Sequence, residues 1–284
     1  MSGLERYLHS YALFATQRGD EFIVAQTAID WAGQADSPEQ AHLRLQKVIQ
    51  FARYCRAEDS RHEIPLKGVC PRRHRRPTPY IYSVEELRDL ILQASFLGPP
   101  GSLRPHTYST LLSLLSMTGL RVSEAIALRL ADYRSEGLHI RESKFRKSRI
   151  VPLHATGHAA LQRYIGKRAV FASSDEDHIF LSGRQQALRG SVVRRTFRNL
   201  LTEAGIGSTR ATKPRLMDLR HTYATTVLLS GPSTRDHACR HMLALSTAMG
   251  HSSMAATFWY LERTPALMND IAQACQENCA RKPS

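Results

Sequence analysis

Five side chains between positions 121 and 260 have the chemistry needed to cut a phosphodiester. They are two arginines, a lysine, a histidine and a late tyrosine, in the order Arg121, Lys144, Arg220, His251 and Tyr260. Arginine binds phosphate oxygens through paired hydrogen bonds and never loses its charge. Tyrosine can supply an attacking oxygen, and lysine can protonate a leaving oxygen. Because a covalent phosphotyrosine conserves the energy of the broken bond, we expect no metal, ATP or other cofactor.

Each segment also has an ordinary structural explanation. Residues 118–124 could be a glycine-ended helix followed by a surface Arg–Glu pair, and residues 142–153 an exposed basic turn. Residues 217–225 could be an amphipathic helix with an exposed Arg–His pair. Tyr260 stands beside two other aromatic residues, which is typical of a hydrophobic core. Only the order and spacing of all the segments together favour catalysis.

These segments resemble the motifs of the tyrosine recombinases, which are integrase-type DNA strand-transferases. The resemblance is strong over residues 80–270 and weak over residues 1–60. Tyr260 follows His251 by nine residues, which is the family spacing. The other matching segments are Thr118-Gly119-Leu120-Arg121-Val122-Ser123-Glu124, Glu142-Ser143-Lys144, Arg149-Ile150-Val151-Pro152-Leu153, Met217-Asp218-Leu219-Arg220-His221-Thr222 and Gly250-His251.

The resemblance implies site-specific recombination or integration of DNA through a 3′-phosphotyrosine, with a role for each residue. Arg121 and Arg220 would hold the scissile phosphate, and Lys144 would protonate the leaving 5′ oxygen. His251 would donate a hydrogen bond to a non-bridging oxygen, and Tyr260 would be the nucleophile. A supporting residue, Glu124, would orient the arginines.

Met217 departs from the family pattern, because the family usually has histidine at this position. A methionine can neither donate a hydrogen bond nor carry a charge. The missing donor is expected to weaken phosphate stabilisation by about 1–3 kcal/mol, so the chemistry would be slower rather than abolished. His221 lies four residues later on the same helical face, but we expect it to serve the structure rather than to replace the absent histidine.

The overall charge favours double-stranded DNA as the partner. The 284 residues include 39 Lys+Arg against 25 Asp+Glu, which gives a formal net charge of +14 and a pI near 10. A merely basic soluble protein is the alternative. There is no apolar run long enough to cross a membrane and no signal-peptide pattern, so we expect no membrane partner. Five cysteines without a CxxC motif indicate a reducing compartment. We expect a cytoplasmic protein associated with the bacterial nucleoid.

The elements predict a mainly α fold with a small antiparallel sheet, in two domains. Residues 1–62 are expected to form a helical core-binding domain, in which one helix begins at the capping residue Ser37. Residues 63–82 form a basic, proline-rich linker. Residues 83–284 form the catalytic domain, which ends in a helix over about 265–278. Residues 138–140 and 149–153 are expected to pair as strands.

Two basic segments outside the catalytic set are expected to touch the DNA backbone. One lies in the linker, for which a solvated chain is an equal alternative. The other follows the catalytic lysine. Their residues are Arg72, Arg73, Arg75 and Arg76 in the linker, with Lys147 and Arg149 after Lys144.

The resemblance further implies a tetramer on DNA, with other recombinases as possible partners, and integration or transposition of a mobile element. Because of Met217, a rival hypothesis is a catalytically impaired DNA-binding accessory protein that docks with an active recombinase. A type IB topoisomerase, which uses similar chemistry, is a second rival.

Overall fold

The computed structural model describes residues 3–70, 78–141, 148–173, 176–208, 212–230 and 235–250; at residue 3 and over 235–241 it describes the backbone alone. The chain divides into two compact units, residues 1–77 and 78–284. Each unit has its own hydrophobic core. Among the described residues, no helix is both long and apolar enough to cross a membrane.

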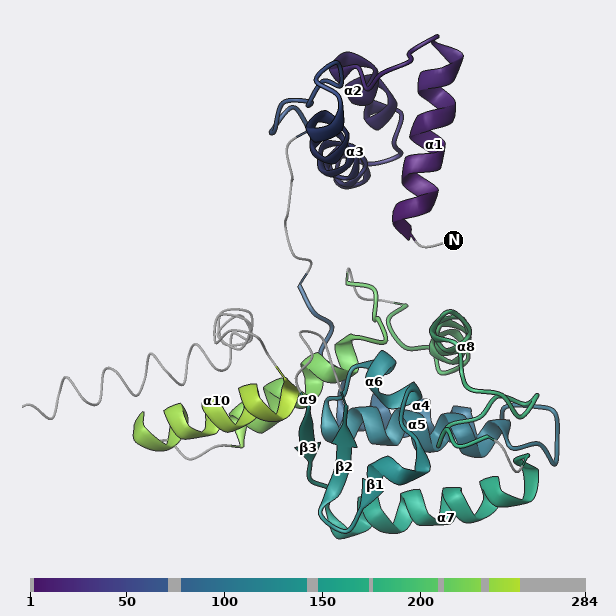
Figure 1. Cartoon of the computed structure of the whole chain (residues 1–284). Coiled ribbons are helices and arrows are strands. Elements are labelled where there is room, and N and C mark those ends of the chain that lie inside the picture. Colours follow the sequence, from purple (N-terminus) through teal and green to yellow (C-terminus); the bar gives the residue numbers. More distant parts are fainter. Residues whose placement is uncertain are drawn as a thin grey trace, which may run out of the picture. The chain divides into compact units, whose positions relative to one another are not determined.

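The first unit contains three described helices, α1 (Gly3–Gln17), α2 (Ala25–Gly33) and α3 (Pro38–Glu58) (Figure 1). The helix start predicted at Ser37 is present, and the Ser37 hydroxyl accepts a hydrogen bond from the amide of Gln40. The core forms where α1 and α2 meet the apolar stripe of α3, around Tyr11, Trp31 and Ile49.

Helix α5 (Arg104–Thr118) lies at the centre of the second unit and packs against four other helices. Its buried leucines, which include Leu111, Leu112 and Leu115, explain why it can be surrounded in this way. The helices that contact it are α4 (Val84–Ser95), α6 (Val122–Ile126), α7 (Ala155–Phe171) and α9 (Asp218–Leu229). The other described helices of this unit are the short 3-10 helix η1 (Leu130–Asp132), α8 (Gly190–Glu203) and α10 (Arg235–Met249).

A three-stranded antiparallel sheet, in the order β1-β2-β3, stands beside these helices. The strands are β1 (Tyr133–Arg134), β2 (Gly137–Ile140) and β3 (Arg149–Val151). In β2 and β3, Leu138 pairs with Val151 and Ile140 with Arg149, so the predicted pairing is confirmed. The two-residue strand β1 was not predicted, because it is too short to show alternation of apolar and polar residues.

The predicted fold class, mainly α with a small antiparallel sheet, is confirmed. The predicted end of a helix at Gly119 is also confirmed, since Gly119 adopts the left-handed conformation (φ 61°) after α5. Both ends of the predicted linker belong to packed structure. Ile64 contacts the core of the first unit, and Tyr80 and Tyr82 belong to the core of the second unit. The helix predicted over 265–278 lies outside the described residues.

Candidate active site

Arg121 lies where α5 ends and α6 begins, and it bonds directly to Glu124. Its backbone amide donates to Oε2 of Glu124 at 3.0 Å, and its Nη1 donates to Oε1 at 2.7 Å. The side chain of Glu124 is 6% exposed, whereas that of Arg121 is 21% exposed. The expected pairing of Arg121 with Glu124 is therefore present, and Arg121 keeps part of its surface open.

Arg220 comes from α9 and is held against the end of α5. Its Nη1 donates to the carbonyl oxygen of Gly119 at 2.6 Å. Gly119 also permits the close approach of α9, because a Cβ at this position would overlap the ring of Tyr223. The two arginines expected to hold the phosphate are thus anchored at the same end of α5, although 99 residues separate them in sequence.

Arg149, the first residue of β3, also binds Glu124. Its Nη2 donates to Oε2 at 2.8 Å and its Nη1 to Oε1 at 3.2 Å, and its side chain is 9% exposed. The three arginines and Glu124 are named here the arginine network. Burial raises the pKa of Glu124, but the hydrogen bonds from Arg149 and Arg121 outweigh it, so that the pKa lies below the usual 4.5.

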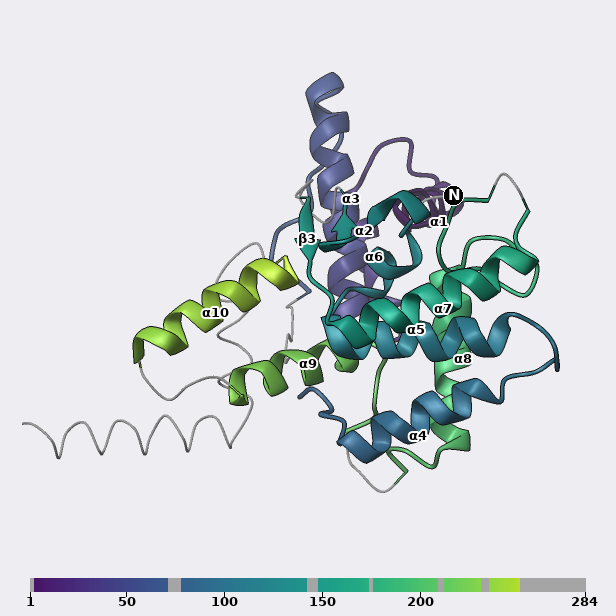
Figure 2. The same cartoon turned by 90° about the horizontal axis from the view of Figure 1, so that it is seen from below.

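The arginine network binds the C-terminal end of α10 through three consecutive carbonyl oxygens. Nε of Arg149 donates to Ala248 at 2.7 Å, Nη2 of Arg220 to Met249 at 2.7 Å, and Nη2 of Arg121 to Gly250 at 3.1 Å. The last carbonyls of a helix have no partner within the helix and attract cations. The strand β3 and the helix α9 contact α10, and Figure 2 shows both beside it.

Met217 sits at the start of α9, outside the arginine network. Its side chain is 48% exposed, whereas Arg220, one turn later, is buried. The structure therefore places the departure from the family pattern at an open position, where another side chain could stand without repacking the core.

Several predicted site residues lie outside the described residues. They are Arg72, Arg73, Arg75 and Arg76 in the linker, Lys144 and Lys147 in the segment before β3, and His251 and Tyr260 after α10. Their roles stay predictions. Of the predicted set, the structure brings together Arg121, Glu124, Arg149 and Arg220.

His221 is half-buried on α9, next to Arg220 in sequence. Its ring lies 3.9 Å from Asp218, and its side chain is 16% exposed. Burial lowers its pKa to about 4, the nearby charge of Asp218 opposes that shift, and Arg215 and Arg220 reinforce it. His221 is therefore neutral near pH 7, which fits the structural role expected for it.

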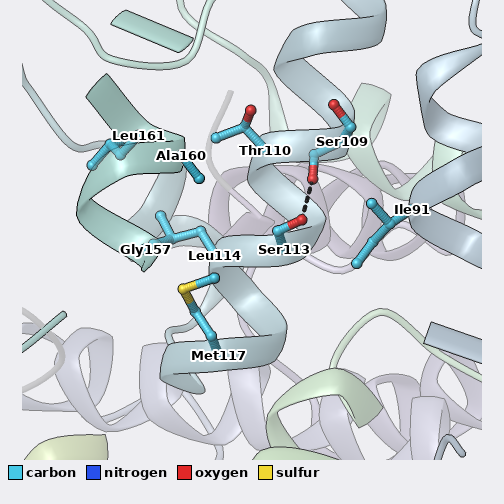
Figure 3. A pocket seen from close by; sticks show the side chains of 9 residues that line it. All are labelled: Ile91, Ser109, Thr110, Ser113, Leu114, Met117, Gly157, Ala160 and Leu161. Carbon is cyan, nitrogen blue, oxygen red and sulfur yellow. Dashed lines mark hydrogen bonds between the residues drawn. The ribbon is translucent and has the colours of Figure 1, made fainter. Parts of the chain in front are cut away.

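Two other features of the second unit do not involve the arginine network. A pocket of about 200 Å³ is lined by residues of α4, α5 and α7. Figure 3 shows Ile91 of α4 and Leu161 of α7 at this pocket, with the Ser113 hydroxyl bonded to the carbonyl oxygen of Ser109. The acidic segment before α8 brings ligand atoms of Glu176, Asp177 and His178 within 4.8 Å of one another. These atoms already bond one another or Arg129.

Helix α8 carries a basic surface that the sequence reasoning missed. Its buried residues Val193 and Phe197 face the core, and its arginines lie on the exposed side. None of these arginines forms an ion pair with a described acidic residue. The pattern that could have revealed this surface is the run from 178 to 202, which has no Asp or Glu. Its five arginines, all exposed, are Arg184, Arg189, Arg194, Arg195 and Arg198.

Comparison with known proteins gives the same family from sequence and from structure. Residues 91–266 match the model of the phage integrase family. The chain is 37% identical over 276 residues to y4rB of Sinorhizobium fredii, whose name provisionally describes an integrase/recombinase; the match covers 94% of this chain and 88% of that one. It is 30% identical over 250 residues to the tyrosine recombinase XerD of Rhizobium meliloti, covering 85% and 76%.

The solved structures agree on the fold. The XerH site-specific recombinase, bound to a palindromic difH substrate in a post-cleavage complex, matches with a TM-score of 0.69 and 17% identity over 95% of this chain and 77% of that one. The chain belongs to the phage integrase family. It is a tyrosine-type DNA recombinase, as the order of its motifs predicted.

The low pKa of His221 predicts a pH-dependent stability that a His221→Gln variant lacks. The unfolded chain takes up a proton near pH 6.5, whereas folded His221 does so only near pH 4. The stability that the neutral ring contributes is therefore complete above pH 6.5 and is lost as the pH falls toward 4, by up to about 3 kcal/mol. Urea unfolding at pH 7 and pH 4.5, followed by circular dichroism, measures it. Equal losses in the wild type and the variant would contradict this assignment.

Proposed function

We propose that this recombinase cuts and rejoins double-stranded DNA at specific sites through a covalent 3′-phosphotyrosine, without a metal ion. The observation that carries the proposal is the arginine network, in which Arg121 and Arg220 bind adjacent carbonyls at one helix end. Donors that are fixed before the substrate arrives need no reorganisation as charge develops on the phosphate. The segment with His251 follows directly after this helix end in the chain.

In the proposed reaction, Tyr260 gives its phenolic proton to water as its oxygen attacks the scissile phosphorus, and the bond to the 5′ oxygen breaks. Lys144 gives its proton to that 5′ oxygen. Arg121, Arg220 and His251 stabilise the non-bridging oxygens. The 5′ hydroxyl of a second strand then attacks the phosphotyrosine and returns a proton to Lys144. Tyr260 is released as a phenolate that takes a proton back from water, so that the number of phosphodiester bonds is conserved.

Two features of the reaction imply several copies of the chain on DNA. Exchange between two duplexes breaks four strands, and each chain offers one nucleophile, so four copies are required for a complete exchange. We propose a homotetramer, or a mixed assembly with other recombinases, acting on a mobile element in the cytoplasm at the nucleoid. The relatives named integrase and recombinase support this proposal and do not favour a topoisomerase.

We propose that the missing histidine at Met217 slows cleavage and does not prevent it. The open position of Met217 supports this, because Met217→His would add a donor beside the phosphate site without disturbing buried groups. The rival hypothesis of an impaired accessory protein differs in one outcome: it predicts that only Met217→His restores cleavage.

Trapping covalent protein–DNA adducts in the native host tests the nucleophile and Met217 together. The wild type is expected to yield adducts at a defined sequence, Tyr260→Phe none, and Met217→His about 10- to 100-fold faster adduct formation. Met217→His should change the free energy of unfolding by no more than about 0.5 kcal/mol. Adducts with Tyr260→Phe would remove Tyr260 from its role. Adducts with Met217→His alone would instead favour the accessory protein.

The basic surface of α8 is proposed to bind the phosphate backbone. Arg194 and Arg198 are one turn apart on the exposed face, so one double variant removes both charges. Arg194→Gln/Arg198→Gln should weaken DNA binding and lower the slope of log K against log salt by about 1–2, because about 0.9 is lost for each phosphate contact. The control is Arg163→Gln, which removes an exposed arginine of α7. Binding titrations between 50 and 300 mM salt measure the slope, and an unchanged slope would exclude α8 from the interface.

A further inference from the structure

We propose that Arg149 is a positioning residue for cleavage, which sets the orientation of Glu124 and the end of α10 and thereby the placement of Arg121 at the phosphate. The inference rests on the proposed function, and it gives Arg149 a role inside the protein in place of contact with the DNA backbone. Three properties of its side chain carry it: its use of every guanidinium nitrogen, its sharing of one carboxylate with Arg121, and its contact with Gly250.

Each of the three guanidinium nitrogens of Arg149 already donates to a protein acceptor. Nη1 and Nη2 hold the two oxygens of Glu124, and Nε holds the carbonyl of Ala248. The side chain is almost entirely buried. Arg121 differs in both respects, because it is more exposed and its Nε has no hydrogen-bond partner among the described residues. Of the two arginines on Glu124, Arg121 therefore offers the more open surface to a phosphate.

The shared carboxylate transmits the position of Arg149 to Arg121. Oε1 of Glu124 accepts from Nη1 of both arginines, and Oε2 accepts from Nη2 of Arg149 and from the backbone amide of Arg121. A bidentate pair fixes the plane of a carboxylate as well as its place. With Arg149 removed, Glu124 would keep only the bonds from Arg121, and the carboxylate plane would no longer be tied to the sheet.

Arg149 also determines what residue can precede His251. Gly250 has a φ of +64°, and a Cβ there would lie 2.8 Å from Nη1 of Arg149. The guanidinium therefore occupies the place that a side chain at position 250 would need. Through this packing and the bond to Ala248, one side chain of β3 fixes the end of α10, 99 residues further along the chain. The chain enters the segment with His251 and Tyr260 from that fixed point.

A positioning role predicts a loss of rate without a loss of DNA affinity. Misplacement of a reacting group by about 1 Å can cost about 100-fold in rate. We therefore expect Arg149→Gln to lower single-turnover cleavage by about 100-fold, while the dissociation constant and its salt slope stay within twofold of the wild type. Arg149→Lys should recover only a small part of the rate, because a single ammonium group cannot hold both carboxylate oxygens.

The experiment combines DNA cleavage with a measurement that needs no DNA. Cleavage and binding are measured on DNA carrying the sequence recovered from the trapped adducts, for the wild type, Arg149→Gln, Arg149→Lys, Glu124→Gln and the Glu124→Gln/Arg149→Gln double variant. The exposed arginine of β1 gives the control Arg134→Gln. In parallel, hydrogen exchange of the backbone amides of 242–250 is followed without DNA, with α1–α3 as the internal reference.

The expected result is that the double variant cleaves no more slowly than the slower single variant, since both substitutions break one unit. Exchange of the α10 amides should also accelerate in Arg149→Gln while that of α1–α3 is unchanged. A salt slope lowered by about 0.9, or rate losses that multiply in the double variant, would overturn the inference in favour of direct DNA contact. Unchanged α10 exchange would overturn it as well. Absence of cleavage by the wild type would instead count against the proposed function, and the exchange measurement would still decide the inference.

Discussion

Two arginines from different elements meet on the buried carboxylate of Glu124, and the geometry of the candidate site follows from that meeting. A carboxylate that is 6% exposed is tolerated only because opposite charges and hydrogen bonds replace its water. Arg121 connects Glu124 to the junction of α5 and α6, and Arg149 connects Glu124 to β3. Loss of one partner from such a pair typically costs about 3–5 kcal/mol, since an uncompensated charge stays buried. Glu124 therefore holds these elements together and positions the arginines of the candidate site.

The end of α10 supplies the second constraint, because its last carbonyls accept from all three arginines of the network. Two glycines make this geometry possible. Gly119 lets the ring of Tyr223 approach the end of α5, and Gly250 leaves room for the guanidinium of Arg149. The positive charges are thus fixed in place before any phosphate arrives, which is the condition under which fixed donors lower a reaction barrier. None of these contacts of Arg121 and Arg220 involves position 217, so the proposed phosphate-binding role of the two arginines does not depend on a histidine there.

Structural features that depend on residues close together in sequence could be predicted. Features that depend on contacts between residues far apart in sequence could not. The start of α3 follows from the capping residue Ser37, and the pairing of β2 with β3 follows from two short apolar runs around a charged turn. The motifs predicted the family and the link between Arg121 and Glu124, which are three residues apart. They could not predict the partners of Arg149, because those lie 25 and 99 residues away and depend on how β3 and α10 pack. The basic surface of α8 was not predicted for another reason, since its arginines are spread over a helix and its signal in the sequence is the absence of acidic residues from 178 to 202.

The most direct test of the central role of Glu124 is the titration of its carboxyl group by carbon-13 NMR in the full chain, assigned with Glu124→Gln. We expect a midpoint below the usual value of 4.5 in the wild type, since the hydrogen bonds from Arg149 and Arg121 outweigh burial. We also expect a higher midpoint in Arg149→Gln, where burial is opposed by Arg121 alone. A wild-type midpoint at or above 4.5, or one that Arg149→Gln leaves in place, would contradict the claim that this carboxylate holds the site together.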